Sequence, residues 1–176
     1  MKSNVGGKMD NSNFIDLLED KMIAFNQGDP MRIQHLIKVH RLAQLIGHME
    51  KLDPHTQFLT ECAALVHDIG IRPAEEQYGA CTGPLQEKVG PAYAEAMLAQ
   101  LRMDAKDIER VSYLVGHHHT YSNIDGIDYQ ILVEADFLVN FYEDSLGSGA
   151  VQSALEKIFR TESGKKLCRT MYCPES

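Results

Sequence analysis

Two acidic residues stand in strongly apolar parts of the sequence, where a carboxylate is costly. Asp68 follows His67 at the end of the apolar run 59–66, and Asp136 interrupts the apolar run 131–139. A buried carboxylate needs a partner of opposite charge, or it takes up a proton. A divalent cation would stabilise both acids, and it would also offset the helix dipole that disfavours Asp68 at a helix end. The alternatives are a capping role for Asp68 and an ion pair between Asp136 and a basic side chain.

Histidines accompany these acids at similar places. His35 falls in the middle of the apolar face of its helix, and the apolar face of helix 105–117 leads to His117 and His118. A single histidine on such a face usually makes only a hydrogen bond in the core. Imidazole and carboxylate without thiolate suit Fe, Mn, Co, Ni or Zn, and Mg as well. The sequence therefore predicts one cation in the core of a helical bundle, held from three helices by His35, His67, Asp68 and Asp136.

Helical periodicity dominates the chain, and the alternation typical of strands is nearly absent. Ser12 and Ser148 are predicted caps, and the Asp-Pro pairs at residues 29–30 and 53–54 are predicted helix starts. The segment 68–91 is rich in Gly and Pro and is predicted to be mostly loop, with 72–88 as a lid over the site. The expected helices span about 12–27, 30–49, 54–67, 92–101, 105–117, 128–142 and 149–160.

Length and composition favour one domain and exclude several classes of partner. The 176 residues suit a loosely packed segment 1–12 followed by one all-α domain over 13–176. With 25 acidic and 17 basic residues, the net charge of −8 argues against duplex nucleic acid and anionic membranes as partners. Four scattered cysteines, no visible signal segment and no membrane-length apolar run predict a cytoplasmic protein.

The order of the candidate ligands resembles the HD superfamily of metal-dependent phosphohydrolases, whose signature is His, then His-Asp, then Asp. The segments 32–39, 63–70 and 134–136 match its three parts, and the likeness spans about residues 30–145. The resemblance implies a single-domain helical bundle of the HD-domain type with a buried metal site. It also implies metal ligands at His35, His67, Asp68 and Asp136.

The number of metals stays open at this point. Relatives with two metals add histidines in the middle of the chain, and His117 and His118 match the later of these positions. The earlier position has no histidine here, although Glu87 could replace it with a carboxylate that a hard metal would accept. Motifs of the relatives that hydrolyse guanosine tetraphosphate or cyclic-di-GMP are missing, so neither activity is expected.

The resemblance implies hydrolysis of a small phosphate ester, such as a nucleotide or a related phosphomonoester or diester, by a metal-activated water. Asp68 is then both a ligand and the base that orients the water. Arg72 is predicted to bind phosphate through its bidentate guanidinium. The other candidates for substrate binding are Lys38, Lys88, Tyr78 and Tyr121, where either tyrosine could stack on a base.

Other functions fit the same residues. A few relatives use this ligand set to hold two irons for an oxygen-dependent cleavage, so an oxygenase is the second enzymatic hypothesis. A third is a non-catalytic sensor in which metal or nucleotide binding shifts an oligomer, and a purely structural bundle is the fourth. The tail 158–173 is short and amphipathic, and it packs either over the bundle or against a second subunit of a homodimer.

Overall fold

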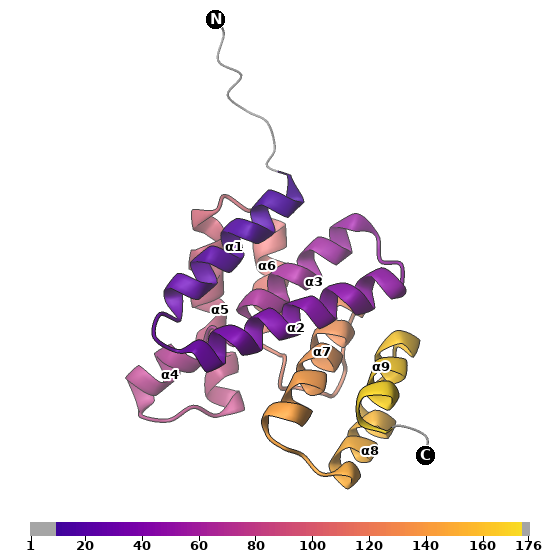
Figure 1. Cartoon of the computed structure of the whole chain (residues 1–176). Coiled ribbons are helices and arrows are strands. Elements are labelled where there is room, and N and C mark those ends of the chain that lie inside the picture. The colour runs from indigo at the N-terminus through magenta and orange to yellow at the C-terminus, as the bar shows by residue number, and fades with distance from the viewer. Residues whose placement is uncertain (1–9, 174–176) are drawn as a thin grey trace, which may run out of the picture.

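The computed structural model describes residues 10–173, which form α-helices joined by turns (Figure 1). The helices are α1 (Asn11–Phe25), α2 (Pro30–Met49), α3 (Pro54–Val66), α4 (Ile71–Tyr78), α5 (Gly83–Gln100), α6 (Ala105–Val115), α7 (Ile127–Glu143), α8 (Ser148–Lys157) and α9 (Glu162–Tyr172). The described residues contain no strand, which confirms the all-α prediction.

Helix α2 lies at the centre and packs along α3 on one side and α7 on another. Both α3 and α7 are buried almost all round, as expected of helices that are apolar on every face. The Asp-Pro starts of α2 and α3 are as predicted, because Asp29 accepts the backbone N–H of Arg32, and Asp53 accepts those of His55 and Thr56. These starts fix where each helix begins, and so which residues face the core.

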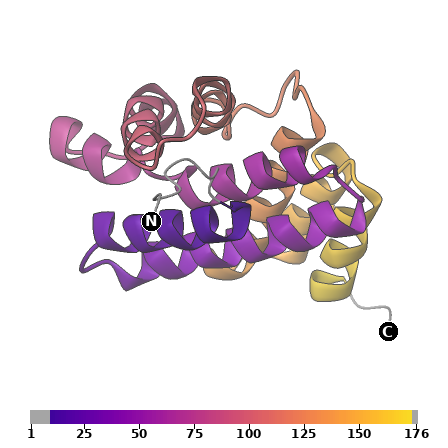
Figure 2. The ribbon, with the colours of Figure 1, turned by 90° about the horizontal axis from the view of Figure 1, so that it is seen from above.

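The remaining helices lie around this centre in two groups. Figure 2 shows α4, α5 and α6 together along one side of the layer formed by α1, α2 and α3, with α8 and α9 at the other end of the molecule. Helix α5 packs on α4 and α6, and α6 packs on α3. The turn after α3 is therefore enclosed between the central helices and the α4–α6 group.

The prediction of a loop over 68–91 was wrong, because α4 and the first half of α5 occupy most of it. Pro73 and Pro84 lie in the first turns of their helices, where a missing N–H costs no helical hydrogen bond. Gly70 and Gly90 serve close packing instead of flexibility: a Cβ on Gly70 would lie 2.9 Å from Gly90 Cα. Of the three prolines in this segment, Pro91 alone lies beyond the first turn of its helix, and α5 continues through it.

Two predicted caps were also displaced. Asn11 is the first residue of α1 and Asp10 holds the cap position, so Ser12 lies inside the first turn. Ser148 is the first residue of α8 and follows Gly147 at the cap. The expected loose segment 1–12 falls mainly on residues 1–9, which lie outside the described residues.

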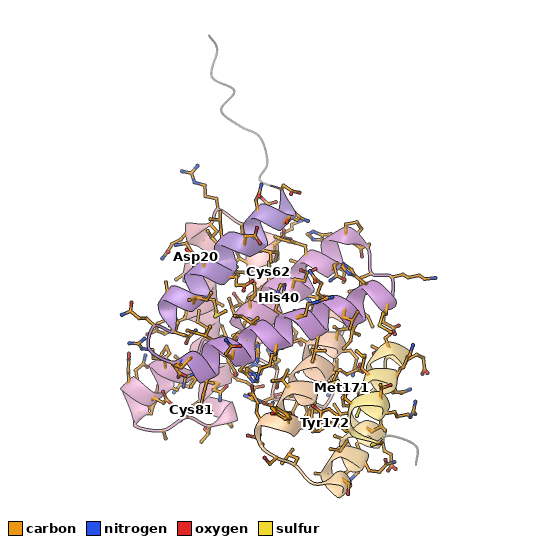
Figure 3. The ribbon with its side chains drawn as sticks, in the orientation of Figure 1. Asp20, His40, Cys62, Cys81, Met171 and Tyr172 are labelled. Atoms are coloured by element: carbon orange, nitrogen blue, oxygen red, sulfur yellow. The ribbon has the colours of Figure 1, made fainter. Side chains whose placement is uncertain are left out.

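The tail packs over the bundle of its own chain. Residues 158–161 form a break after α8, and α9 then packs against α7, α8 and α2. Tyr172 points from α9 toward α7 and donates its hydroxyl hydrogen to the Leu138 carbonyl (Figure 3). The C-terminal helix thus supports the helix that carries Asp136.

Candidate metal centre

Four side chains from three parts of the fold converge where α2, α7 and the turn after α3 meet. His35 Nε2 lies 3.3 Å from His67 Nε2, 3.4 Å from Asp68 Oδ2 and 3.2 Å from Asp136 Oδ1. His67 Nε2 lies 3.6 Å from Asp68 Oδ2 and 3.5 Å from Asp136 Oδ1. At most 13% of any of these side chains is exposed. Two imidazole nitrogens therefore face two carboxylate oxygens in the interior.

A second group of ligand atoms shares Asp68. Its other oxygen, Oδ1, lies 3.3 Å from His118 Nε2. His119 completes the group, since one ligand atom from each of the three residues lies within 4.8 Å of the others. His118 Nε2 is buried and makes no hydrogen bond, which is a costly state for a polar atom. Asp68 therefore stands between two groups of nitrogens, one at each carboxylate oxygen.

Backbone carbonyls orient two of these imidazoles. His67 Nδ1 lies 2.9 Å from the Ala64 carbonyl, and His118 Nδ1 lies 2.8 Å from the Val115 carbonyl. Because a carbonyl oxygen only accepts, each Nδ1 carries a proton. In the neutral form of each ring, this hydrogen bond leaves the lone pair on Nε2, which faces Asp68 as a metal ligand must.

The charges of the cluster depend on one another. Burial raises the pKa of the Asp68 and Asp136 carboxyls, but the neighbouring histidines lower both pKa values overall. The charge of His67 and the contact with His118 lower the pKa of Asp68. Hydrogen bonds from His35 and His67 lower the pKa of Asp136. Burial opposes protonation of His35, yet the hydrogen bond to Asp136 and the charge of Asp68 raise its pKa from 6.5 to about 9. Without a metal, the cluster therefore holds a proton on His35 at neutral pH.

The consecutive histidines 117–119 point in different directions. His117 donates from Nδ1 to the Tyr113 carbonyl at 2.7 Å, and its ring stacks on the Tyr113 ring with 4.1 Å between centroids. Neither group of ligand atoms includes His117. The structure therefore brings His118, and not His117, to Asp68.

Residues of helix α5 hold His119 in place. The Nε2 atom of His119 lies 3.0 Å from Gln86 Oε1, and the backbone N–H of His119 donates to Glu87 Oε1 at 3.0 Å. Burial and the nearby His118 lower the pKa of His119, which keeps its ring neutral. Glu87 also accepts from the Thr120 hydroxyl and belongs to neither group of ligand atoms. Glu87 therefore fixes the backbone beside the cluster.

The predicted phosphate clamp, Arg72, is engaged at the surface. It donates from Nη1 to the Phe25 carbonyl at 3.0 Å and from Nε to Glu76 at 3.1 Å. Lys88 lies over the ring of Tyr78, with 5.3 Å between its Nζ and the ring centroid. The structure shows none of these three side chains in contact with the cluster.

Tyr121 lies close enough to the cluster for its charges to act on it. Its ring packs on the ring of Phe137, with 5.1 Å between the two centroids. Phe137 is the residue that follows Asp136 in the sequence. Burial, Asp136 and Glu87 raise the pKa of Tyr121 to about 12, so its hydroxyl stays protonated. Of the predicted substrate-binding residues, Tyr121 is thus beside the site as a neutral donor.

Two residues that the structure places at the site, His119 and Glu143, were not among those predicted from the sequence. His119 was not predicted as a ligand, although it belongs to the same run of three histidines as His117 and His118. Glu143 lies 2.7 Å from His35 Nδ1, across 108 residues of sequence, and also pairs with Lys38. Its position two helical turns after Asp136 places it on the same face of α7 and would have been the signal to use.

The chain belongs to the HD domain family, whose family model matches residues 32–159. Among solved structures, it is similar to a predicted HD superfamily hydrolase from an uncultured Thermotogales bacterium. The two are 27% identical, with a TM-score of 0.61, and the match covers 92% of this chain and 84% of the other. A comparison with curated proteins found no match. Within residues 10–173, no helix is long and apolar enough to cross a membrane.

Proposed function

We propose that the protein is a metal-dependent phosphohydrolase that acts on a small phosphate ester, such as a nucleotide or a related phosphomonoester or diester. The observation that carries this proposal is the convergence of His35, His67, Asp68 and Asp136 in the order of the HD signature. Membership of the HD family and the similar HD superfamily hydrolase support the class of reaction. The substrate is proposed from the resemblance alone.

The donor set fits a divalent transition metal. Ligand atoms around one cation, at bond lengths of about 2.0–2.2 Å, are roughly 3–4 Å apart. The 3.2–3.6 Å separations between the two imidazoles and from each imidazole to each carboxylate agree with this spacing. The ligand atoms of His35, His67 and Asp68 all lie within 4.8 Å of one another, and Asp136 adjoins this group through the two imidazoles. Two nitrogens and two oxygens suit Fe, Mn, Co, Ni or Zn better than Mg, which prefers oxygen. The buried Nε2 of His118, whose contact with Asp68 Oδ1 lacks hydrogen-bond geometry, supports a second cation. We infer that His35, His67, Asp68 and Asp136 hold the first ion, and that Asp68, His118 and His119 hold the second.

A cation bound here lowers the pKa of a water toward neutrality and polarises a phosphoryl oxygen. The chain itself contributes rigid orientation, because the Ala64 and Val115 carbonyls fix two of the imidazoles. If the first group alone held a cation, Asp68 Oδ1, which lies 3.3 Å from His118 Nε2, would be the oxygen placed to accept a proton from a water. If both groups held cations, Asp68 would contribute one oxygen to each group. We further propose that the Tyr121 hydroxyl donates to a phosphate oxygen.

Metal analysis combined with a substrate screen tests this proposal. Protein purified without chelator is analysed for bound metal and assayed for release of phosphate from nucleotides and from simple phosphomonoesters and diesters. We expect hydrolysis that chelation abolishes and that Mn²⁺ or Co²⁺ restores. Metal-loaded protein that hydrolyses none of these esters would contradict the proposal. Oxygen consumption by the iron-loaded protein in the same assays would favour the oxygenase instead.

A further inference from the structure

Helix α7 contacts both nitrogens of the His35 imidazole. Asp136 Oδ1 lies 3.2 Å from Nε2, and Glu143 Oε2 lies 2.7 Å from Nδ1. The two acids are two turns apart on α7, so they share one face and hold the ring between them. His35 is thereby fixed at each end by one element.

His35 needs a partner from another element because of its position. His67 and His118 follow the ends of α3 and α6, where the carbonyls of the last turn have no helical partner, and each uses one of them. His35 instead lies inside α2, where the preceding carbonyls accept the amide hydrogens of the helix. The partner of its Nδ1 is a side chain from another helix, the Glu143 carboxylate on α7.

Glu143 is itself held in place by α2. Its other oxygen, Oε1, makes an ion pair with Lys38, which lies one turn after His35. Glu143 is the last residue of α7, where the helix dipole disfavours a carboxylate. Its side chain is nevertheless only 25% exposed and faces His35 and Lys38. This placement is unfavourable for the helix by itself, and the contacts with α2 account for it.

We propose that Glu143 is a positioning residue of the metal centre, and that Lys38 supports it. Glu143 keeps the proton on Nδ1 of His35, directs the Nε2 lone pair toward Asp68 and Asp136, and makes the ring a more basic ligand. This role rests on the proposed metal site. A carboxylate that partners a metal-binding histidine typically changes metal affinity by about 10- to 100-fold. We expect Glu143 to contribute an effect of that size.

To test this role, the metal-free protein is titrated with Co²⁺ alone. Binding is measured by calorimetry and by the visible absorption of the bound ion. Glu143→Ala is expected to weaken Co²⁺ binding by about 10- to 100-fold. Glu143→Gln is expected to recover part of that loss, because its amide oxygen still accepts from Nδ1. Lys38→Met is expected to weaken binding less than Glu143→Ala. The matched control is Glu162→Gln, which removes an exposed carboxylate on α9 that is paired with Lys165.

The outcomes separate this role from the metal site and from a structural effect. Thermal unfolding and circular dichroism of the metal-free variants measure any loss of fold. If the wild type binds Co²⁺ and folded Glu143→Ala binds it equally well, the role of Glu143 is overturned and the metal site stands. The role is also overturned if Glu143→Gln, which loses the ion pair with Lys38, binds as poorly as Glu143→Ala. If the wild type binds no Co²⁺, the proposed metal site fails, and the role of Glu143 fails with it.

Discussion

Helix α2 carries two buried histidines next to carboxylates, and the two clusters differ in how their carboxylates are satisfied. His40 points toward α3 (Figure 3), where its Nε2 lies 3.1 Å from Glu61 Oε2. Glu61 also accepts from Gln44 at 2.9 Å and from Gln57 at 2.7 Å. Burial opposes its ionisation, yet these hydrogen bonds lower the pKa of Glu61 overall. One carboxylate is matched by three donors.

The cluster at His35 has the opposite balance. There two ionised carboxylates, Asp68 and Asp136, both lie beside the imidazoles of His35 and His67. The Nε2 atom of His118 makes no hydrogen bond. Protons on the rings are the chain's own means of offsetting the carboxylates. A buried acid with enough amide and imidazole donors is typical of a structural network, whereas two buried acids that share imidazoles are what we expect of the proposed cation site.

The largest expected effect comes from removing the carboxylate shared by both groups. Asp68→Ala should abolish stoichiometric metal binding and lower phosphatase activity by on the order of 10³-fold, because the pKa of the attacking water is then no longer lowered. Metal analysis and steady-state kinetics measure both effects. His67→Ala should behave similarly. Full metal retention in both variants would contradict the assignment.

The next effect separates the two groups of ligand atoms. His118→Ala should lose about one of two bound equivalents of metal, since its Nε2 faces Asp68 Oδ1 at 3.3 Å. His117→Ala is the matched control, because its ring stacks on Tyr113 instead. Equal metal content in the two variants would mean that the second group does not bind metal.

The pH dependence should have opposite signs for stability and for metal affinity. The folded-state pKa of His35, about 9, lies above its ordinary value of 6.5. Its contribution to stability is therefore complete below pH 6.5, and roughly 3 kcal/mol is lost as the pH rises toward 9. Metal must displace the same proton, so affinity should rise about tenfold per pH unit from 7 to 9. Urea unfolding of metal-free protein and Co²⁺ titration at several pH values test this. Stability and affinity that change in the same direction would contradict it.

The smallest effect on the site should come from the network at His40. Glu61→Ala removes the carboxylate that accepts from His40, Gln44 and Gln57 and should lower the free energy of unfolding by about 1–3 kcal/mol. Metal affinity should stay at the wild-type value, because no atom of Glu61 contacts the other cluster. Urea unfolding and Co²⁺ titration of the same sample show whether the two clusters are independent. Loss of metal binding in a folded Glu61→Ala variant would show that they are not.

Local sequence signals predicted the elements that carry the site. The Asp-Pro starts located α2 and α3, and the cost of acids in apolar runs singled out Asp68 and Asp136, which the structure brings to His35. Their role as ligands remains a prediction. The long-range features were not predictable in this way. Helices α4 and α5 contain glycines and prolines that read as a loop until the close packing of Gly70 on Gly90 is seen.

The same limit applies to side chains that act across the fold. Glu143 reaches His35 because α7 packs along α2. A helical wheel of α7 places Glu143 on the same face as Asp136, but it does not show that this face meets His35. His119 differs from His117 in its tertiary contacts, such as that of its ring with Gln86 on α5. Pattern and spacing place a residue on a face, whereas tertiary packing decides which other face it meets.

Anomalous X-ray diffraction from crystals of protein purified without chelator tests the central claim most directly. We expect a metal peak about 2.0–2.3 Å from His35 Nε2, His67 Nε2, Asp68 Oδ2 and Asp136 Oδ1. A metal-containing protein whose anomalous peaks all lie away from these four atoms would contradict it.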